Sequence, residues 1–344
     1  MRHLELHILQ SVPVACLNRD DFGSPKTAMF GNVQRARVSS QCWKRAVREL
    51  LMEEAPQQFG GHRTRLIIEP LRSKLEQLGF SVEEAQQGAE KLGDALAKLD
   101  NPPTRVKTLF FTSPQELNIL ASVYAETKDT KKAMKALGKT LPGDAADIAL
   151  FGRMVASDHS LTLEGAAMFS HALSTHRVSN EIDFFSAVDD LKPEDAEDAG
   201  AGMTGTLEFN SATYYRFAAL NLDMLKDDAH LGGLRPEELQ EVVRMFVRAT
   251  LTAMPAARHN SMHAATLPSF ALAVVREKGH PVQLVNAFEE PVWTRGGLAV
   301  ASRKKLEEEY EHLKKTWGFD ALAECRMPDI PLAQLLDEVV QHVR

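Results

Sequence analysis

The residues best suited to chemistry gather between Cys16 and Arg48, where positively charged side chains surround a short loop and the start of a helix. This stretch carries seven Lys and Arg residues against two Asp residues, although the whole chain has a formal net charge of −7. Ser39 and Ser40 offer an N-cap for the helix, and free N–H groups at a helix N-terminus attract phosphate. Cations and neutral donors around such a terminus would hold a nucleic-acid backbone without reading its bases. The residues with this potential are Arg19, Lys26, Arg37, Ser39, Gln41, Lys44, Arg45 and Arg48. The alternative is an ordinary helix with a solvated basic face.

Two neighbouring carboxylates in the same stretch, Asp20 and Asp21, raise a second possibility. A pair of Asp side chains can coordinate a divalent ion in a metal-dependent endoribonuclease. The other interpretation, which we favour, is that they pair with Arg19 or with other cations of the loop. No nucleophile with an associated base is evident elsewhere in the sequence.

Two further patterns match known sites only in their letters. Residues 200–205 match the dinucleotide-binding fingerprint, but an acidic stretch precedes them where that site requires a buried strand. His259 and His263 are four apart, yet Asn260 stands where a zincin has Glu, and no third ligand is evident. We therefore expect no cofactor and no metal site. A small-molecule enzyme with an unrecognised site remains the third alternative.

The elements around the basic stretch are predicted from residue periodicity. Apolar and polar residues alternate over residues 3–9, which predicts a strand with one buried face. Residues 33–38 predict a second, short extended segment, and residues 40–55 predict the helix capped by Ser39 and Ser40. Residues 62–156 are expected to be almost wholly helical, with helices over 66–78, 82–99, 114–137 and 144–156.

The second half of the chain predicts mixed structure. Residues 166–176 and 207–217 have strand composition, and the acidic segment 178–208 between them lacks periodicity, which indicates a long loop leaving the fold. Helices are expected over 236–254, 304–316 and 332–343, and strands over 270–275 and 282–285. This order favours a small α+β sheet domain that carries insertions.

Composition limits the class of protein. The chain has 344 residues, of which 44% are hydrophobic and 25% charged, as in a globular protein. It has no run of about 18 uncharged apolar residues, and its first residues do not resemble a secretory leader. Three widely spaced cysteines do not make a disulfide framework, so a reducing cytoplasm is expected.

Three motifs, in order along the chain, carry a resemblance to a known family. The first comprises residues 16–21, Lys26, residues 30–31, 37–41 and 44–46; the second is residues 149–154; the third joins residues 175–176 to residues 182–191. Together they resemble the backbone subunit of the type I-E CRISPR surveillance complex Cascade, the CasC or Cse-type RAMP protein. The similarity is scattered over the first 220 residues or so and is weaker beyond them.

The resemblance implies an α+β fold with an RRM-like, ferredoxin-like palm, a helical fingers insertion and a protruding thumb loop or hairpin. On this basis residues 1–60, 161–177 and 209–344 would form the palm, residues 61–160 the fingers and residues 178–208 the thumb. Several copies would assemble as a helical filament along one guide RNA (crRNA), which remains free to pair with target DNA. The family member is not an enzyme, and antiviral interference involves the large, small and two end-capping Cascade subunits and a recruited helicase-nuclease.

The resemblance also assigns roles to side chains. The cations and polar residues of the basic stretch would hold the RNA backbone, and Phe184 and Phe185 would contact bases from the thumb, since aromatic faces stack on any base. Phe184 stands where Trp is expected in the family. The alternative for both is a small apolar cluster that anchors the thumb. Met154 is a candidate for a second wedge between bases, with a core methionine as the alternative.

A lysine run forms the second basic cluster of the chain. Its members follow one another at spacings of three and four, which places them on one side of a helix: Lys128, Lys131, Lys132, Lys135 and Lys139. They could guide incoming duplex DNA through its phosphates, or they could form a solvated helix face. The sequence leaves both interpretations open.

Overall fold

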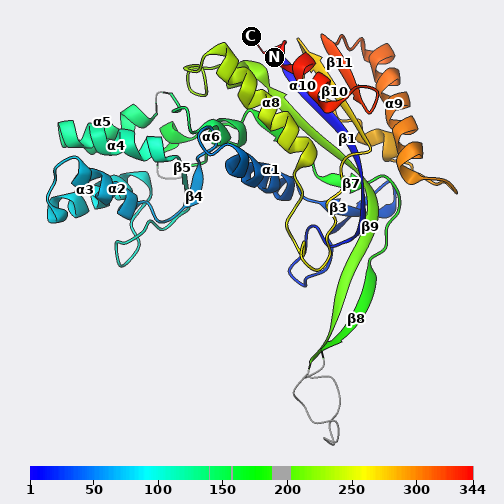
Figure 1. The fold of residues 1–344 in the computed structure, drawn as a ribbon, viewed down its shortest axis with the longest axis horizontal. Coiled ribbons are helices and arrows are strands. Elements are labelled where there is room, and N and C mark those ends of the chain that lie inside the picture. Colours follow the sequence, from blue (N-terminus) through cyan, green and yellow to red (C-terminus); the bar gives the residue numbers. More distant parts are fainter. Residues whose placement is uncertain (139, 156–157, 188–202, 344) are drawn as a thin grey trace, which may run out of the picture.

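The computed structural model describes residues 1–138, 140–155, 158–187 and 203–343. The chain has a mixed α+β fold in which a twisted antiparallel sheet and its covering helices form one part and a bundle of short helices forms another (Figure 1). The described N- and C-terminal segments lie close together at the same end of the sheet (Figure 1). Lys139 and residues 188–202 of the expected thumb lie outside the described residues.

The long strands at the centre of the sheet hold the fold together. Along its main path the strands follow the order β11-β10-β1-β9-β7-β3-β2, and β6 and β8 also pair with β9. Every named pairing is antiparallel. The bounds are β1 His3–Ala15, β2 Thr27–Phe30, β3 Val33–Val38, β6 Ala167–Phe169, β7 Ala172–Ser174, β8 Glu181–Ala187, β9 Met203–Asn221, β10 Phe270–Arg276 and β11 Ala323–Met327.

Helices cover both faces of this sheet. On one face α1 (Ser40–Glu54), α8 (Pro236–Thr252) and α10 (Leu332–Val340) pack on alternate residues of β1, such as Leu4 and Leu6. On the other face α9 (Leu298–Trp317) packs over Leu9 and Tyr215. A short helix, α7 (Leu222–Leu225), follows β9. The sequence therefore predicted the strand at residues 3–9 and its buried apolar face correctly, and the structure buries the polar face as well.

The polar face of β1 is buried because its side chains satisfy one another. Glu5 accepts hydrogen bonds from the His3 ring at 3.0 Å, from Arg276 at 3.1 Å and from the backbone N–H of Val282 at 3.0 Å. Burial by itself raises the pKa of Glu5, but the hydrogen bonds from His3 and His7 outweigh it and lower the pKa to about 2. A paired carboxylate of this kind can be buried without a large penalty.

The helical lobe has a core of its own. It contains α2 (Ile68–Gln77), α3 (Val82–Leu96), α4 (Pro114–Thr127) and α5 (Thr130–Leu137), and their buried faces share residues such as Leu71, Leu92 and Leu120. The two-stranded ribbon β4 (His62–Thr64) and β5 (Phe110–Thr112), with α6 (Ala146–Phe151), connects this lobe to the sheet (Figure 1). The sequence did not predict β4 and β5, because three-residue strands have no readable period.

Two predicted helices differ most from their expected bounds. The helix expected over 114–137 is broken at Lys128, whose φ of 53° is left-handed and ends α4. The helix expected over 144–156 is reduced to α6, because Gly152 follows it with a φ of 76°. Ala156 lies outside the described residues.

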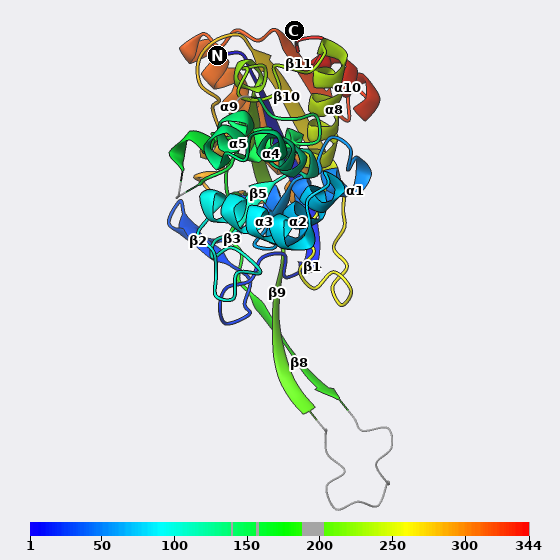
Figure 2. The same ribbon diagram turned by 90° about the vertical axis from the view of Figure 1, so that its left-hand side faces the viewer.

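The acidic segment also differs from its prediction. Residues 181–187 are not a loop: they form β8, which pairs in register with the first part of β9 in a two-stranded ribbon that projects away from the sheet (Figure 2). Residues 282–285 are not a strand, and the 3₁₀ turn Val285–Phe288 begins at their end. Strand β11 was not predicted. A second 3₁₀ turn covers His159–Leu161.

A search of the described residues finds no helix long and apolar enough to cross a membrane.

Candidate nucleic-acid interface

The loop that follows β1 is organised by its own polar groups. Oδ1 of Asp20 accepts backbone hydrogen bonds from Phe22 and Ser24, both at 2.9 Å, and Gly23 adopts a φ of 89° that favours glycine. Oδ1 of Asn18 accepts a hydrogen bond from the backbone N–H of Ser39 at 2.9 Å, which ties the loop to the start of α1. The carboxylate of Asp20 is therefore engaged in shaping the loop.

The start of α1 is formed as predicted. Ser39 is the N-cap, and its hydroxyl oxygen accepts a hydrogen bond from the backbone N–H of Cys42 at 3.2 Å. Ser39 itself is buried, so the role that the structure gives its hydroxyl is to cap the helix. Next to this helix start lies a cavity of about 620 Å³, lined by the 17–23 loop, by α1 and by residues 255–257.

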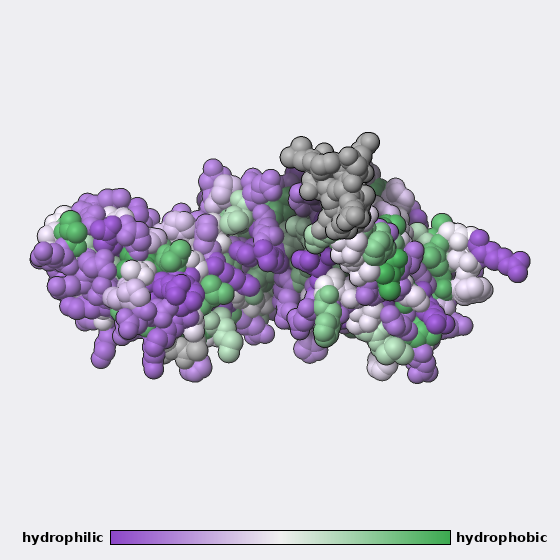
Figure 3. Space-filling model, turned by 90° about the horizontal axis from the view of Figure 1, so that it is seen from below, coloured by the Kyte–Doolittle hydropathy of each residue, from purple (hydrophilic) through white to green (hydrophobic). Residues whose placement is uncertain are grey.

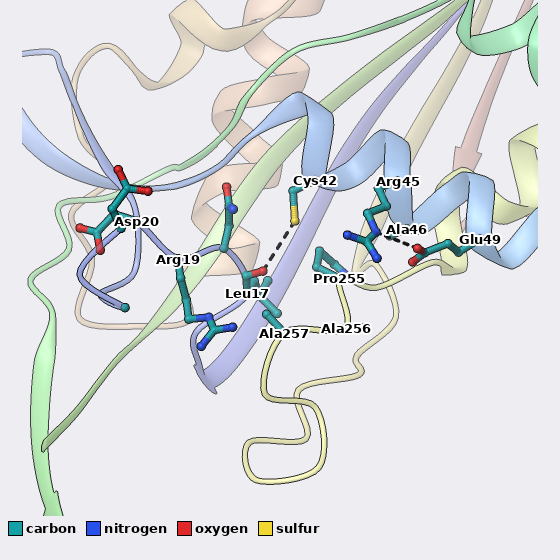
Figure 4. Close-up of a pocket in the computed structure, with 13 residues that line it drawn as sticks. Leu17, Arg19, Asp20, Cys42, Arg45, Ala46, Glu49, Pro255, Ala256 and Ala257 are labelled. Atoms are coloured by element: carbon teal, nitrogen blue, oxygen red, sulfur yellow. Dashed lines mark hydrogen bonds and ion pairs between the residues drawn. The ribbon is translucent and has the colours of Figure 1, made fainter. Parts of the chain in front are cut away.

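The cations around this cavity differ in exposure. Arg19 and Arg45 are exposed and extend beside the 255–257 segment, whereas Asp20 lies on the other side of the loop (Figure 4). Arg45 donates a hydrogen bond to Glu49 at 2.7 Å, and this bond raises its pKa. Because the pair is exposed, it contributes little stability and can be exchanged for another anion. Gln41 is also exposed on α1.

Lys44 and Arg48 occupy a different face of α1, as their spacing predicted. Nζ of Lys44 lies 5.9 Å from the centre of the Phe169 ring, and Cζ of Arg48 lies 5.7 Å from the centre of the Phe111 ring. Arg48 also donates a long hydrogen bond of 3.5 Å to the Gly61 carbonyl. Arg48 therefore turns toward β5 and Lys44 toward β6, and neither side chain lines the cavity.

The two remaining members of the basic stretch lie on the β2–β3 side. Lys26 and Arg37 are half-buried, and the backbone N–H of Arg37 donates to the Lys26 carbonyl at 2.9 Å. Nε of Arg37 donates to the Thr27 carbonyl at 3.2 Å. The eight predicted residues therefore do not make a single surface: they fall into a group beside the cavity, a pair on another face of α1 and a pair beside β2 and β3.

Two further arginines near this region were not among the predicted site residues, and only one of them is exposed. Arg35 is fully buried and its guanidinium donates to the carbonyls of Phe30, Ser174 and Phe288, so it joins segments of the sheet instead of meeting a ligand. Arg63 is exposed on β4, with Cζ 4.8 Å from the centre of the Phe111 ring. The sequence does show two arginines close together, Arg63 and Arg65, but no residue pattern indicates that this segment packs beside α1.

The projecting ribbon places the two predicted aromatic residues on opposite faces. Phe185 pairs with Gly205, and a Cβ added to Gly205 would lie 2.7 Å from its ring, so Phe185 covers the backbone of β9. Phe184 pairs with Thr206 and is 66% exposed. Gly205 lies within this strand and so does not form part of a dinucleotide loop. Residues 200–202 of that pattern lie outside the described residues.

Met154 is 86% exposed, so the interpretation of it as a core methionine is wrong. It directly follows Arg153, which is buried and paired with Glu116 at 2.7 Å. The position of Met154 is thus fixed by a buried ion pair, while its own side chain is free to contact a ligand.

The lysine run does not lie on one helix. Lys128 is the left-handed residue that ends α4, with Nζ 3.2 Å from the centre of the Phe80 ring. Lys131, Lys132 and Lys135 belong to α5 and are all exposed, whereas Lys139 lies outside the described residues. The predicted five-lysine stripe is therefore wrong as a single helix face, and three described lysines remain together.

The underside of the molecule carries mostly hydrophilic side chains on the helical lobe, with small hydrophobic groups scattered among them (Figure 3). Within the described ranges, no group of three or more His, Cys, Asp or Glu residues is arranged to hold a metal ion. His259 and His263 lie in the loop that follows α8 and share no helix.

A family model matches nearly the whole chain, and two solved structures share its fold. A sequence profile described as CT1975-like protein matches residues 4–334. A chain from a structure titled "CRISPR RNA-guided surveillance complex, pre-nicking" superposes with a TM-score of 0.84 at 28% identity, covering 99% of this chain and 100% of that chain. A chain from "CRISPR RNA-guided surveillance complex" gives 0.73 at 24% identity, covering 98% and 99%. No curated protein matches the sequence.

Proposed function

Because the chain belongs to the CT1975-like protein family, that of the type I-E Cascade backbone subunit, we propose that it binds guide RNA and assembles in several copies along it. The filament presents the RNA for pairing with target DNA. The chain acts with the large, small and end-capping subunits and with a recruited helicase-nuclease. Base pairing supplies the target specificity, so the protein needs only to hold the RNA backbone.

The topology supports a division into palm, fingers and thumb. The strands β10-β1-β9-β7 are neighbours, and the chain visits them in the order β1, α1, β7, β9, α8, β10. A βαββαβ unit with this strand order is ferredoxin-like, the arrangement of an RRM. We assign this unit and its extensions to the palm, the helical lobe to the fingers and the β8–β9 ribbon to the thumb.

One observation carries the proposal: α1, with its cations, packs on the same sheet from which the β8–β9 ribbon with exposed Phe184 projects. Arg19 and Arg45 border the cavity beside the helix start, and Gln41 is exposed on α1. Arg48 extends the cationic surface toward β5 and Lys44 extends it toward β6. Phosphate contacts there would fix the register of the RNA. Phe184 and Met154 are exposed apolar side chains that can separate or stack on bases.

We propose no catalytic role. The alternative nuclease requires Asp20 or Asp21 to bind a metal, and one oxygen of Asp20 already accepts two backbone hydrogen bonds in its loop. Asp21 is exposed beside the same cavity. Magnesium-dependent cleavage of RNA that is abolished by Asp21→Ala would establish the alternative.

The experiment that tests the proposal is the native mass of the protein co-expressed with its genomic neighbours and a guide-RNA array. Several copies on one RNA are expected for the unaltered chain. The variant Lys44→Glu with Arg48→Glu should lose the RNA, because it reverses two charges on α1. Lys91→Glu with Lys98→Glu is the matched control, since it reverses two exposed charges of the helical lobe. A monomer without RNA in the unaltered chain would refute the proposal.

A further inference from the structure

Three cations from two separate elements converge where α1 meets β4. Arg48 and Arg63 both lie over the Phe111 ring, with Cζ 5.7 and 4.8 Å from its centre, and Lys44 lies beside them over Phe169. Arg48 donates to the Gly61 carbonyl, two residues before Arg63. The aromatic rings fix the planes of the guanidinium groups without neutralising their charge.

No carboxylate of the described residues lies within ion-pair distance of these cations. None of the three forms an ion pair, unlike Arg45 one turn away or Arg65 two residues further on. Partial burial, and then the neighbouring Arg63, lower the pKa of Lys44. Burial, and then Arg48, lower the pKa of Arg63. The fold therefore holds like charges close together at a cost in stability.

One buried carboxylate lies behind the cluster. Asp147 is fully buried in α6, and its two oxygens face the Gly61 backbone: a Cβ added to Gly61 would lie 2.6 Å from each. No side chain donates a hydrogen bond to it. Burial raises its pKa to about 6, against the opposing influence of Arg48. The single negative charge of Asp147 does not balance three cations, so the cluster keeps a net positive charge. A further anion bound there would neutralise it.

We propose that Lys44, Arg48 and Arg63 together bind one phosphodiester group of the guide RNA, and that Arg63 is the ligand supplied by the fingers. The proposal rests on the proposed function and adds a contact that joins the palm to the fingers through the RNA. Guanidinium groups match the two free oxygens of a phosphodiester, and the ammonium of Lys44 adds a compact charge. We favour RNA over DNA because Lys44 and Arg48 share α1 with Arg45, which lines the cavity, and with the exposed Gln41.

The test measures how guide-RNA binding by the full chain depends on salt. Loss of one phosphate contact to a single strand should reduce the slope of log K against log salt by about 0.7. Arg63→Gln should show this reduction and bind less tightly at low salt. Arg63→Lys should keep the slope, because it keeps the charge, but bind several-fold less tightly. Arg105→Gln is the control, because it removes an arginine of the same lobe that is paired with Asp100.

The outcomes separate the two proposals. Guide RNA that fails to bind the unaltered chain would refute the proposed function itself. Binding by the unaltered chain, with Arg63→Gln and Arg105→Gln showing the same slope, would overturn only the role of Arg63. A loss confined to target-DNA binding would also overturn it, in favour of a DNA contact. Thermal unfolding of both glutamine variants excludes loss of fold as the cause, and the Arg63→Lys variant gives a second readout.

Discussion

Asp147 provides a prediction about how stability depends on pH. Its carboxylate is fully buried and no side chain hydrogen-bonds to it, so the folded protein favours the protonated form. We expect the stabilising contribution of protonated Asp147 to be fully present below pH 3.8, its ordinary pKa, and to be lost as the pH rises through about 6. Above pH 6 the group should reduce stability by a constant amount.

The size of the effect follows from the difference between the two pKa values. A rise from 3.8 to about 6 corresponds to a loss of about 3 kcal/mol between pH 4 and pH 7. Asp147→Asn removes the titrating group, so the variant should gain about 3 kcal/mol relative to the unaltered chain over this interval. This loss of stability at neutral pH is consistent with a carboxylate whose negative charge is needed beside Arg48 and Arg63.

The assay is urea unfolding of the RNA-free protein at several values of pH between 4 and 7. The quantity compared is the difference in unfolding free energy between Asp147→Asn and the unaltered chain at each pH. Asp21→Asn, which changes an exposed carboxylate, should give a curve parallel to that of the unaltered chain. A constant difference between Asp147→Asn and the unaltered chain across the interval would refute the reasoning.

Three further predictions concern other parts of the fold. Gly31→Ala should destabilise the protein by at least about 2 kcal/mol in thermal or urea unfolding, because φ is 59° and the new Cβ would lie 1.7 Å from a backbone oxygen. Gly23→Ala, at a φ of 89° with open space around it, should cost only about 1 kcal/mol, and equal costs would contradict this account. Glu5→Gln should lower the free energy of unfolding by about 3 kcal/mol at pH 7, because it removes a carboxylate whose pKa falls from 4.5 to about 2 on folding. The stabilisation by this carboxylate is fully present above pH 4.5 and disappears as the pH falls through 2. A difference in unfolding free energy that does not change with pH would contradict this prediction. Phe184→Ala should weaken guide-RNA binding by about 1–3 kcal/mol in a titration and leave the melting temperature unchanged, because Phe184 is exposed. Phe185→Ala should instead speed hydrogen exchange of the β8 amides, because the Phe185 ring covers Gly205. The reverse pattern would show that the two residues have exchanged roles.

Much of the local structure was predictable from the sequence. The Ser39 cap, the helix from residue 40 and the strand at residues 33–38 depend on neighbouring residues and formed as expected. The two faces of α1 also follow from helical spacing alone. Residue periodicity missed the ribbon, which the family resemblance allowed as a hairpin, because the strand pairing between residues 181–187 and 203–209 joins separate parts of the chain. Once the ribbon forms, the alternation of a strand separates Phe184 from Phe185.

Local sequence determined the type and order of the charged groups, the helix caps and the family motifs. Only the tertiary structure decided which groups meet: the burial of Glu5, the break at Lys128 and the approach of Arg63 to Lys44 and Arg48. The physical reason is that helix capping and side-chain periodicity act within a few residues. Burial, pKa and the convergence of charges depend instead on segments that packing brings together from far along the chain.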